Sequence, residues 1–498
     1  MTNSSNGNNF QRRDFIKVSA LAGMAAVIPQ VGRAAQSPAG GSKPSPAGVK
    51  RTVTVVSDTP ENYEKLMASI RSMKEFEFQT SFVKADFRKP EDVANVLKET
   101  ATDVFVIGLP GIGVTSGRFA DNVGSLQTPI ILIPPILELI MLEADVVARL
   151  QGKGVNAMLA NSESKVLDLI RVVSRPRILE GKKALIFGKP FDSSSVPAPE
   201  LDVDYIYQHT GVRLEYRPIS DLLPLLQAVD EDKAKEEMQR WKQDALNIVE
   251  PTDEAILKAS RMYVLLRSII DKENLSAISI DCLSFSFDAE PILPLPCLGY
   301  TRLRDEGVAA PCEADVCMLL SSMFLQEISQ KPSFFHNVSE VNIEQSYTVL
   351  RHCVAPTKLL GADKAPLPFN LRDYHGFGRD IVPEVDFPVG EEITMGGFSK
   401  DLNSFLLWPG RIQPGVMDTD TPSFANVPED APATMKNMRR FCSNRAQVKI
   451  RDAEMFLGNI AGIHQVMVAG SYSKTIYDAA RRMNVQVIAP PDLTPPSV

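Results

Sequence analysis

The chain has 498 residues, of which 44% are apolar and 23% charged, a balance typical of a folded globular protein and not of a disordered one. The length predicts about three domains, and six cysteines are too few for a disulfide scaffold. The net charge of −8 argues against a nucleic-acid binder, so no nucleic-acid partner is expected.

Residues 1–35 predict an export signal. The pair Arg12-Arg13 precedes a run of apolar and small residues from Val18 to Val31, an order typical of a signal peptide of the twin-arginine type. We therefore expect the twin-arginine translocase as a partner during export and a periplasmic or other extracytoplasmic location. Residues 36–50 then form a flexible tether. No later run of 18 apolar residues occurs, so no membrane span is expected after signal removal.

Residues 51–178 alternate short β-branched runs with helical stretches, which favours an α/β fold with a doubly wound parallel sheet. The predicted strands are 52–57, 78–83, 102–109, 129–133 and 155–159, and the predicted helices are 61–74, 90–100, 138–151 and 162–173.

Residues 179–330 predict a second α/β unit. Its expected strands are 184–188 and 277–284, and its expected helices are 200–209, 221–227, 230–245, 254–273 and 317–328. Residues 331–498 differ, because short strands separated by proline and glycine suit an antiparallel sheet or small barrel. The expected elements there are extended runs within 333–352, strands 392–395, 404–407, 466–469 and 485–489, and helix 473–483.

The loop from Gly108 to Gly113 follows a predicted strand and superficially suggests a phosphate-binding loop. Its glycine spacing does not match the dinucleotide fingerprint, and Pro110 lies in its middle. A plain loop at the end of a strand is the alternative.

Two acids precede the predicted helix 317–328. If Pro311 takes the first helical position, Glu313 and Asp315 lie in the first turn. There the helix dipole stabilises acids whether or not they have a function. Residues two apart on a helix diverge by about 200°, so at most one of the pair is expected to be a ligand.

Histidine is scarce, with only five residues. His464 lies just ahead of an apolar strand and His352 at a strand end; each has either a structural role or a role in binding. An acid at a helix start together with late histidines is compatible with a divalent metal site. The four cysteines between Cys282 and Cys317 contain no Cys-x-x-Cys pair, so no zinc site is expected among them.

Four segments, in order, resemble the second half of the L-fucose isomerase-like family, which includes folds of the L-fucose and L-arabinose isomerase type. They are Gly307-Val-Ala-Ala-Pro-Cys-Glu-Ala-Asp-Val316, Lys331-Pro-Ser-Phe-Phe-His-Asn337, Arg351-His-Cys-Val-Ala-Pro356 and Gly462-Ile-His-Gln-Val-Met-Val-Ala-Gly470. The resemblance covers roughly residues 280 to 495. It implies two Rossmann-like domains (51–178 and 179–330) and a mixed α+β C-terminal domain (331–498) with a small antiparallel β-barrel.

The resemblance also implies a metal-dependent sugar isomerase. Aldose and ketose would interconvert through an ene-diol, with a divalent metal, Mn²⁺ in particular, and a sugar as the substrate, in a homo-oligomer. Glu313 falls on the family's position for a carboxylate ligand and proton-transfer group, and His464 on its histidine ligand. Asn337 stands where the second carboxylate is expected and would be a weaker metal ligand. Asp315 is then a further catalytic acid, and His352 and His336 are expected to contact the substrate.

Asn337 keeps a second hypothesis open, because an amide cannot act as a general base near neutral pH. The protein would then bind sugars without isomerising them. A third hypothesis is an exported oxidoreductase that binds a nucleotide at Gly108 to Gly113.

Overall fold

The computed structural model describes residues 50–74, 76–110, 117–124, 126, 128–134, 140–174, 177–191, 202–288, 290–415, 442–460 and 462–493. The export signal predicted over residues 1–35 lies outside these ranges. Within them, no helix combines the length and the apolar character that crossing a membrane requires.

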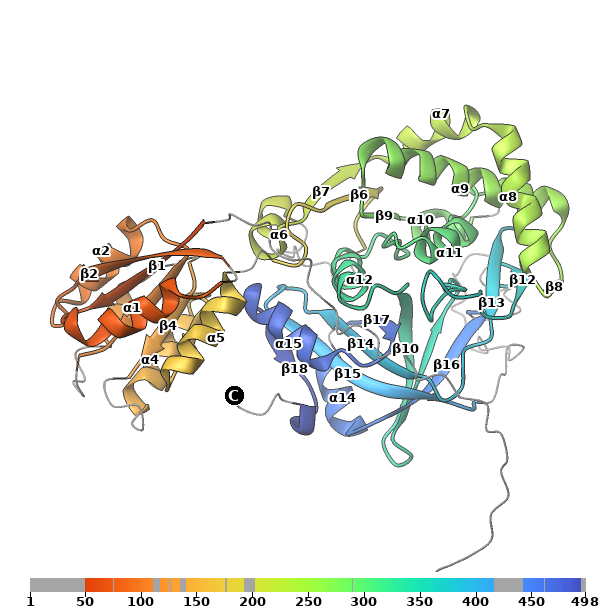
Figure 1. Cartoon of the computed structure of the whole chain (residues 1–498). Coiled ribbons are helices and arrows are strands. Elements are labelled where there is room, and N and C mark those ends of the chain that lie inside the picture. Colours follow the sequence, from red (N-terminus) through yellow and green to blue (C-terminus); the bar gives the residue numbers. More distant parts are fainter. Residues whose placement is uncertain are drawn as a thin grey trace, which may run out of the picture. The chain divides into compact units, whose positions relative to one another are not determined.

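Residues 50–174 contain a five-stranded parallel sheet in the order β2-β1-β3-β4-β5 (Figure 1, orange to yellow). One apolar cluster packs helices α2 to α4 on one face of the sheet, and a second packs α1 and α5 on the other. Of the three inner strands, β3 and β4 are buried along their whole length, as strands covered on both faces should be. The bounds are β1 Lys50–Ser57, α1 Glu64–Arg71, β2 Glu77–Lys84, α2 Pro90–Glu99, β3 Val104–Gly108, α3 Phe119–Asn122, β4 Ile130–Ile133, α4 Met141–Gln151, β5 Ala157–Leu159 and α5 Glu163–Val173.

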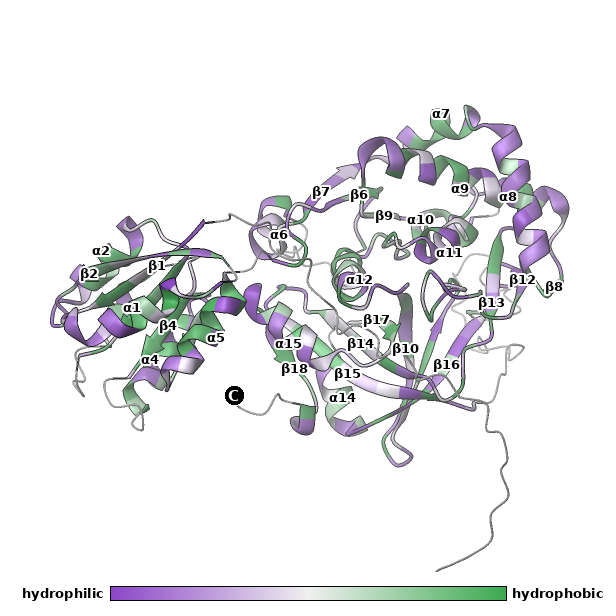
Figure 2. Cartoon of the chain, in the orientation of Figure 1, coloured by the Kyte–Doolittle hydropathy of each residue, from purple (hydrophilic) through white to green (hydrophobic). Residues whose placement is uncertain are grey.

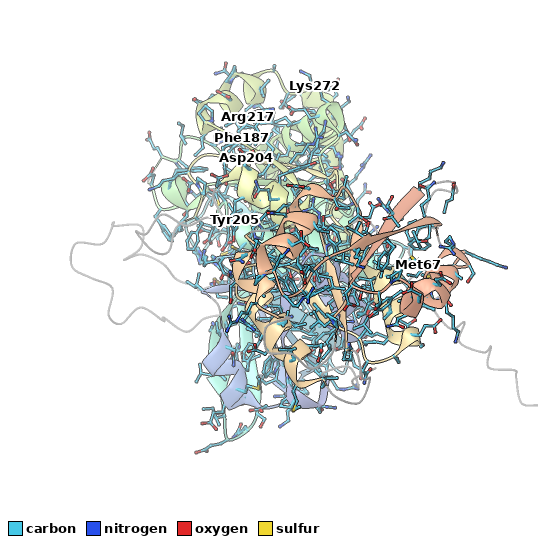
Figure 3. All side chains as sticks on the ribbon, turned by 90° about the vertical axis from the view of Figure 1, so that its left-hand side faces the viewer. Met67, Phe187, Asp204, Tyr205, Arg217 and Lys272 are labelled. Carbon is cyan, nitrogen blue, oxygen red and sulfur yellow. The ribbon has the colours of Figure 1, made fainter. Side chains whose placement is uncertain are left out.

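A second parallel sheet has the order β7-β6-β9. Arg217 of β7 lies opposite Phe187 of β6 (Figure 3). Its guanidinium binds both Glu215 and Glu273. The bounds are β6 Lys183–Phe187, α6 Val203–Thr210, β7 Arg213–Arg217, α7 Leu222–Gln227, α8 Glu231–Asp244, α9 Asp253–Glu273, β9 Ala277–Ile280, α10 Leu283–Ser286, α11 Cys297–Asp305 and α12 Val316–Ser329. The strand predicted over 277–284 is therefore too long, because α10 follows it.

Helix α8 is hydrophilic along most of its length (Figure 2). It is anchored through Trp241, which is buried under the guanidinium of Arg302 at 4.1 Å from the ring centroid.

The C-terminal part holds a mixed sheet in the order β14-β17-β10-β11-β16-β15-β18, in which β14 also pairs with β15. All pairs are antiparallel except β15 with β18. A smaller sheet has the order β13-β12-β8. The bounds are β8 Asn247–Ile248, β10 Phe334–Asn342, β11 Tyr347–His352, β12 Phe369–Asp373, β13 Ile381–Val385, β14 Glu392–Phe398, β15 Ser404–Gln413, β16 Asn444–Ile450, α14 Ala453–Asn459, β17 His464–Ala469, α15 Ser473–Arg482 and β18 Gln486–Ile488. The predicted fold class is thus confirmed as parallel sheets flanked by helices, followed by a mixed sheet.

Helix α12 joins the second parallel sheet to the C-terminal one, because it packs against β9, β14 and β17 (Figure 1). It is apolar all round and almost wholly buried, as expected for a helix in the core. At Gly397 of β14 a Cβ would lie 2.7 Å from the Met318 methyl group, so a larger residue there would require the Met318 side chain to shift. The start of α12 is thereby held against the strands that carry the candidate site.

Candidate metal centre

Glu313, His352 and His464 meet at the start of α12. The Glu313 carboxylate lies 3.4 Å through Oε1 from His352 Nε2 and 3.4 Å through Oε2 from His464 Nε2. One ligand atom from each of the three lies within 4.8 Å of the others. His352 ends β11, His464 begins β17, and Glu313 belongs to the loop before α12, so the cluster is a product of tertiary structure.

The loop that carries Glu313 has an unusual backbone. Glu313 and Ala314 both adopt positive φ, 66° and 54°, a region that residues other than glycine enter at an energetic cost. Helix α12 begins only at Val316. The expectation that Glu313 and Asp315 lie in the first helical turn and diverge is therefore wrong.

Asp315 is the N-cap of α12 and also contacts His464. Its Oδ1 accepts a hydrogen bond from the Met318 backbone N–H at 3.0 Å, and its Oδ2 lies 3.0 Å from His464 Nδ1. A carboxylate only accepts hydrogen bonds, so Nδ1 of His464 carries the hydrogen that faces Asp315. The opposite edge of the imidazole ring, with Nε2, faces Glu313. Both acids thus contact the same imidazole from opposite edges, and Asp315 is placed to orient it.

Burial acts on the charges of this cluster. It raises the pKa of Glu313 and of Asp315, but contacts with His352 and His464 outweigh it, so both acids have a pKa below the usual value. Burial lowers the pKa of His352 in spite of its contact with Glu313. At neutral pH the acids are therefore ionised and His352 is neutral, the forms in which these groups bind metals.

The ligand distances fit a metal ion. Bonds of about 2.1 Å put neighbouring ligand atoms about 3.0 Å apart in octahedral and about 3.4 Å apart in tetrahedral coordination. The two Glu313–imidazole distances of 3.4 Å fall in this range. If the His464 imidazole is neutral with its hydrogen on Nδ1, its Nε2 and the facing Glu313 oxygen are two acceptors, which need a proton or a cation between them.

Asn337 and His336 lie on β10, next to β17. Asn337 is the register partner of His464, and His336 that of Gln465. Opposite residues of antiparallel strands project to the same side, so Asn337 shares a sheet face with His464. Among the described residues, Asn337 Oδ1 and both ring nitrogens of His336 have no hydrogen-bond partner. Burial lowers the pKa of His336 to about 3, so that this ring is neutral.

Aromatic rings surround the imidazoles. Phe335 lies 4.4 Å from the His464 ring and 4.7 Å from the His352 ring between centroids, and Phe191 lies 5.1 Å from His464. A pocket of about 10 Å³ opens beside His464 and Asp315, which is room for about one water molecule. A larger cavity of about 310 Å³ is lined by other residues, among them Asp386 and Arg445.

Most predicted site residues are found at this cluster. His352, which is expected to contact the substrate, faces Glu313 and could also be a metal ligand. Phe191 and Phe335 were not predicted, because an apolar ring in a core segment carries no signal of a site. In the loop after β3, residues 111–116 lie outside the described ranges. The space beside Gly108 is filled by the Tyr63 side chain.

Comparison of the sequence with models of known protein families gave no match, and comparison with curated proteins gave none.

Proposed function

We propose that the protein is a metal-dependent aldose–ketose isomerase of the L-fucose isomerase-like family. The observation that carries the proposal is the convergence of Glu313, His352 and His464 with Asp315 behind His464. The four ordered sequence segments add support, because three of them contribute a residue to this group. We also propose the finer fold, which consists of two Rossmann-like domains and a small β-barrel. The barrel is supported by β14, which pairs with both β15 and β17.

One carboxylate and two imidazoles suit a divalent first-row metal ion, and we propose Mn²⁺. Glu313 and the Nε2 atoms of His352 and His464 would hold it, and Asn337 Oδ1 would be a weaker fourth ligand. When bound, such an ion would supply Lewis-acid polarisation of neighbouring sugar oxygens.

The chain's own residues would divide the remaining work. Glu313, ionised because its pKa is lowered, would take and return the proton that moves between sugar carbons 1 and 2. Asp315 would orient His464, since both its oxygens are already engaged. The rings of Phe191 and Phe335 would limit access of water to the imidazoles.

The test is a metal analysis of the purified mature protein together with a screen of aldoses for ketose formation. We expect one Mn²⁺ per chain at this site and turnover of at least one aldose. Both should be lost in Glu313→Gln and kept in the control Glu340→Gln, an exposed acid of β10. The absence of both metal and turnover in the wild-type chain would refute the proposal.

A second candidate function is sugar binding without isomerisation. It is favoured by Asn337, because the side chain at the expected second carboxylate cannot accept a proton near neutral pH. Calorimetry with the same aldoses separates the two, since binding heat without ketose formation supports this function. Export to the periplasm and assembly into a homo-oligomer remain predictions common to both.

A further inference from the structure

A second group of metal-ligating side chains lies outside the Glu313 cluster. Cys353, His375 and Cys442 place one ligand atom each within 4.8 Å of one another. Cys353 Sγ lies 3.3 Å from His375 Nε2 and 3.8 Å from Cys442 Sγ. All three side chains are buried.

These distances are those of ligands around one tetrahedral ion. Zinc–sulfur bonds of about 2.3 Å and zinc–nitrogen bonds of about 2.1 Å put two sulfurs about 3.8 Å apart and a sulfur and a nitrogen about 3.6 Å apart. The observed 3.8 and 3.3 Å lie within about 0.3 Å of these values. In a disulfide the sulfurs would be only about 2.05 Å apart.

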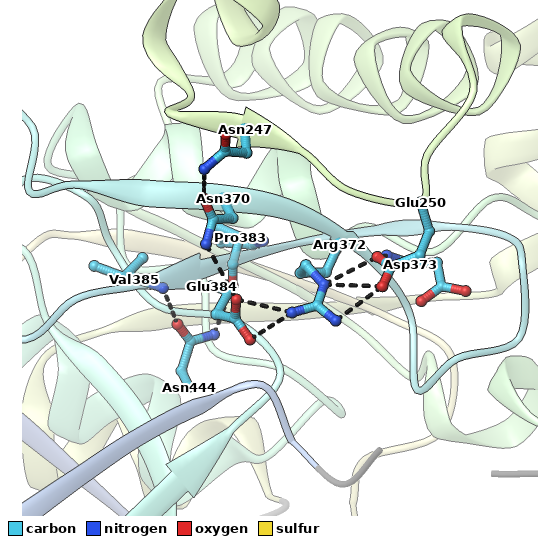
Figure 4. A network of polar contacts seen from close by, with 9 residues as sticks. All are labelled: Asn247, Glu250, Asn370, Arg372, Asp373, Pro383, Glu384, Val385 and Asn444. Carbon is cyan, nitrogen blue, oxygen red and sulfur yellow. Dashed lines mark hydrogen bonds and ion pairs between the residues drawn. The ribbon is translucent and has the colours of Figure 1, made fainter. Parts of the chain in front are cut away.

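Polar contacts hold the backbone at Cys353 and near the other two ligands. The fully buried Asn444 donates to the carbonyl of Pro383 and accepts from the Val385 N–H (Figure 4). It also donates to the carbonyl of Cys353. Asn444, which lies two residues after Cys442, thereby connects the end of β11 to β13.

His375 lies in the turn between β12 and β13. Asp373 accepts a hydrogen bond from the Gly378 N–H in this turn, and Asp380 accepts one from the Leu295 N–H. His375 and Cys442 both adopt positive φ, 52° and 37°. Backbone strain of this kind persists where the surrounding structure enforces it, and it is common at functional sites.

The chemistry of the thiols argues against a nucleophile. The contact with Cys442 and burial raise the pKa of the Cys353 thiol well above its usual value. A catalytic cysteine needs the opposite shift, towards thiolate near neutral pH. A bound cation would instead stabilise two thiolates in this buried place.

We propose that Cys353, His375 and Cys442 bind one zinc ion, separate from the ion at Glu313. Its role is to fix the end of β11, where Cys353 directly follows His352. Spacing in the sequence did not reveal the site, because its cysteines are 89 residues apart and His375 lies 22 residues after Cys353.

Cobalt substitution of the full chain tests this proposal. Co²⁺ bound by thiolates shows a sulfur-to-metal charge-transfer absorption that a carboxylate–imidazole site cannot give. We expect this absorption with a stoichiometry of one per chain, and its displacement by Zn²⁺. Cys353→Ser and Cys442→Ser should lose it. Cys282→Ser, a buried thiol outside the group, and Glu313→Gln should keep it.

The wild-type chain alone can overturn the proposal, so the test survives a variant that fails to fold. The absence of a thiolate absorption after addition of Co²⁺ would refute it. So would a Cys353–Cys442 disulfide found by mass spectrometry in the chain as isolated. Retention of the absorption in folded Cys442→Ser would refute it as well. Loss of manganese or isomerase activity in Glu313→Gln concerns the other site and leaves this result unaffected.

Discussion

The imidazole of His464 is held by the carboxylate of Asp315, whose Oδ2 lies 3.0 Å from Nδ1. The same Asp315 caps helix α12 through Met318. The orientation of a possible metal ligand is therefore coupled to the start of the helix that fills the core. A second carboxylate of this kind commonly fixes the tautomer of a metal-binding histidine and strengthens its binding.

Asp315→Asn should weaken metal binding about 10- to 100-fold, the usual effect of losing such an outer partner. Asparagine is an equally good N-cap, so the helix should remain and the free energy of unfolding should change little. Calorimetric titration with Mn²⁺, alongside chemical denaturation, measures both quantities. Equal Mn²⁺ affinity in variant and wild type would contradict the role given to Asp315.

His352→Ala should abolish tight metal binding, because it removes one of three ligands and leaves the half-buried Glu313 carboxylate with only one imidazole. The matched control is His209→Ala, since His209 lies on α6 and stacks on Tyr205 at 3.9 Å. Metal content after dialysis is the measurement. A full metal complement in the His352 variant would show that His352 is not a ligand.

Asn337→Asp should strengthen Mn²⁺ binding by about tenfold or more, because it puts a charged oxygen where a neutral one stands opposite His464. If the wild-type chain binds sugars without turnover, this variant is also the one in which isomerase activity should first be detected. Asn342→Asp, at the other end of β10, is the control. Unchanged Mn²⁺ affinity would place Asn337 outside the metal site.

Asp305 predicts a pH dependence of stability. Burial raises its pKa to about 6, although Thr357 and the Lys358 N–H donate hydrogen bonds to it. The folded chain therefore binds more protons than the unfolded chain between about pH 4 and 6. The stabilisation from the protonated form is present below about pH 4 and is lost as the pH rises through about 6.

Asp305→Asn removes this titration. From pH 4 to pH 7, the free energy of unfolding of the variant should gain about 2 kcal/mol relative to that of the wild type. Denaturation at a series of pH values measures it. A difference between the two proteins that does not change with pH would contradict the raised pKa.

Arg304→Met should destabilise the fold by about 3 kcal/mol or more, because it leaves buried carbonyls without a donor. Arg304 is 1% exposed and donates to the carbonyls of Ala310 and Val354. Arg411→Met removes an exposed ion pair with Glu392 and should cost at most about 1 kcal/mol. Similar losses in both variants, measured by chemical denaturation, would contradict this distinction.

Apolar patterns predicted much of the fold. Strands such as β3 and β4 and helix α5 follow from buried β-branched runs and regular helical spacing. Strand β7 was missed because charged side chains alternate along Arg213–Arg217, and α11 because its apolar residues show no clear helical stripe. Strand β7 and helix α11 therefore depend on packing against neighbouring elements more than on their own sequence pattern.

The candidate site was predicted only in part. The resemblance pointed to Glu313 and His464, but no spacing rule contains the positive φ of Glu313 and Ala314 that brings the carboxylate between two imidazoles. The Cys353, His375 and Cys442 group was not predicted at all. Its members come together through strand pairing and turns, and no sequence pattern between them predicts this contact.

His352 and Cys353 are neighbours in the chain, and each belongs to a different ligand group. Adding or removing one residue between β11 and the segment after it would shift one of the two out of place. A change in length at this point should therefore be harmful to at least one ligand group. Natural variation here should appear as exchanged side chains beside the two ligands and not as gaps.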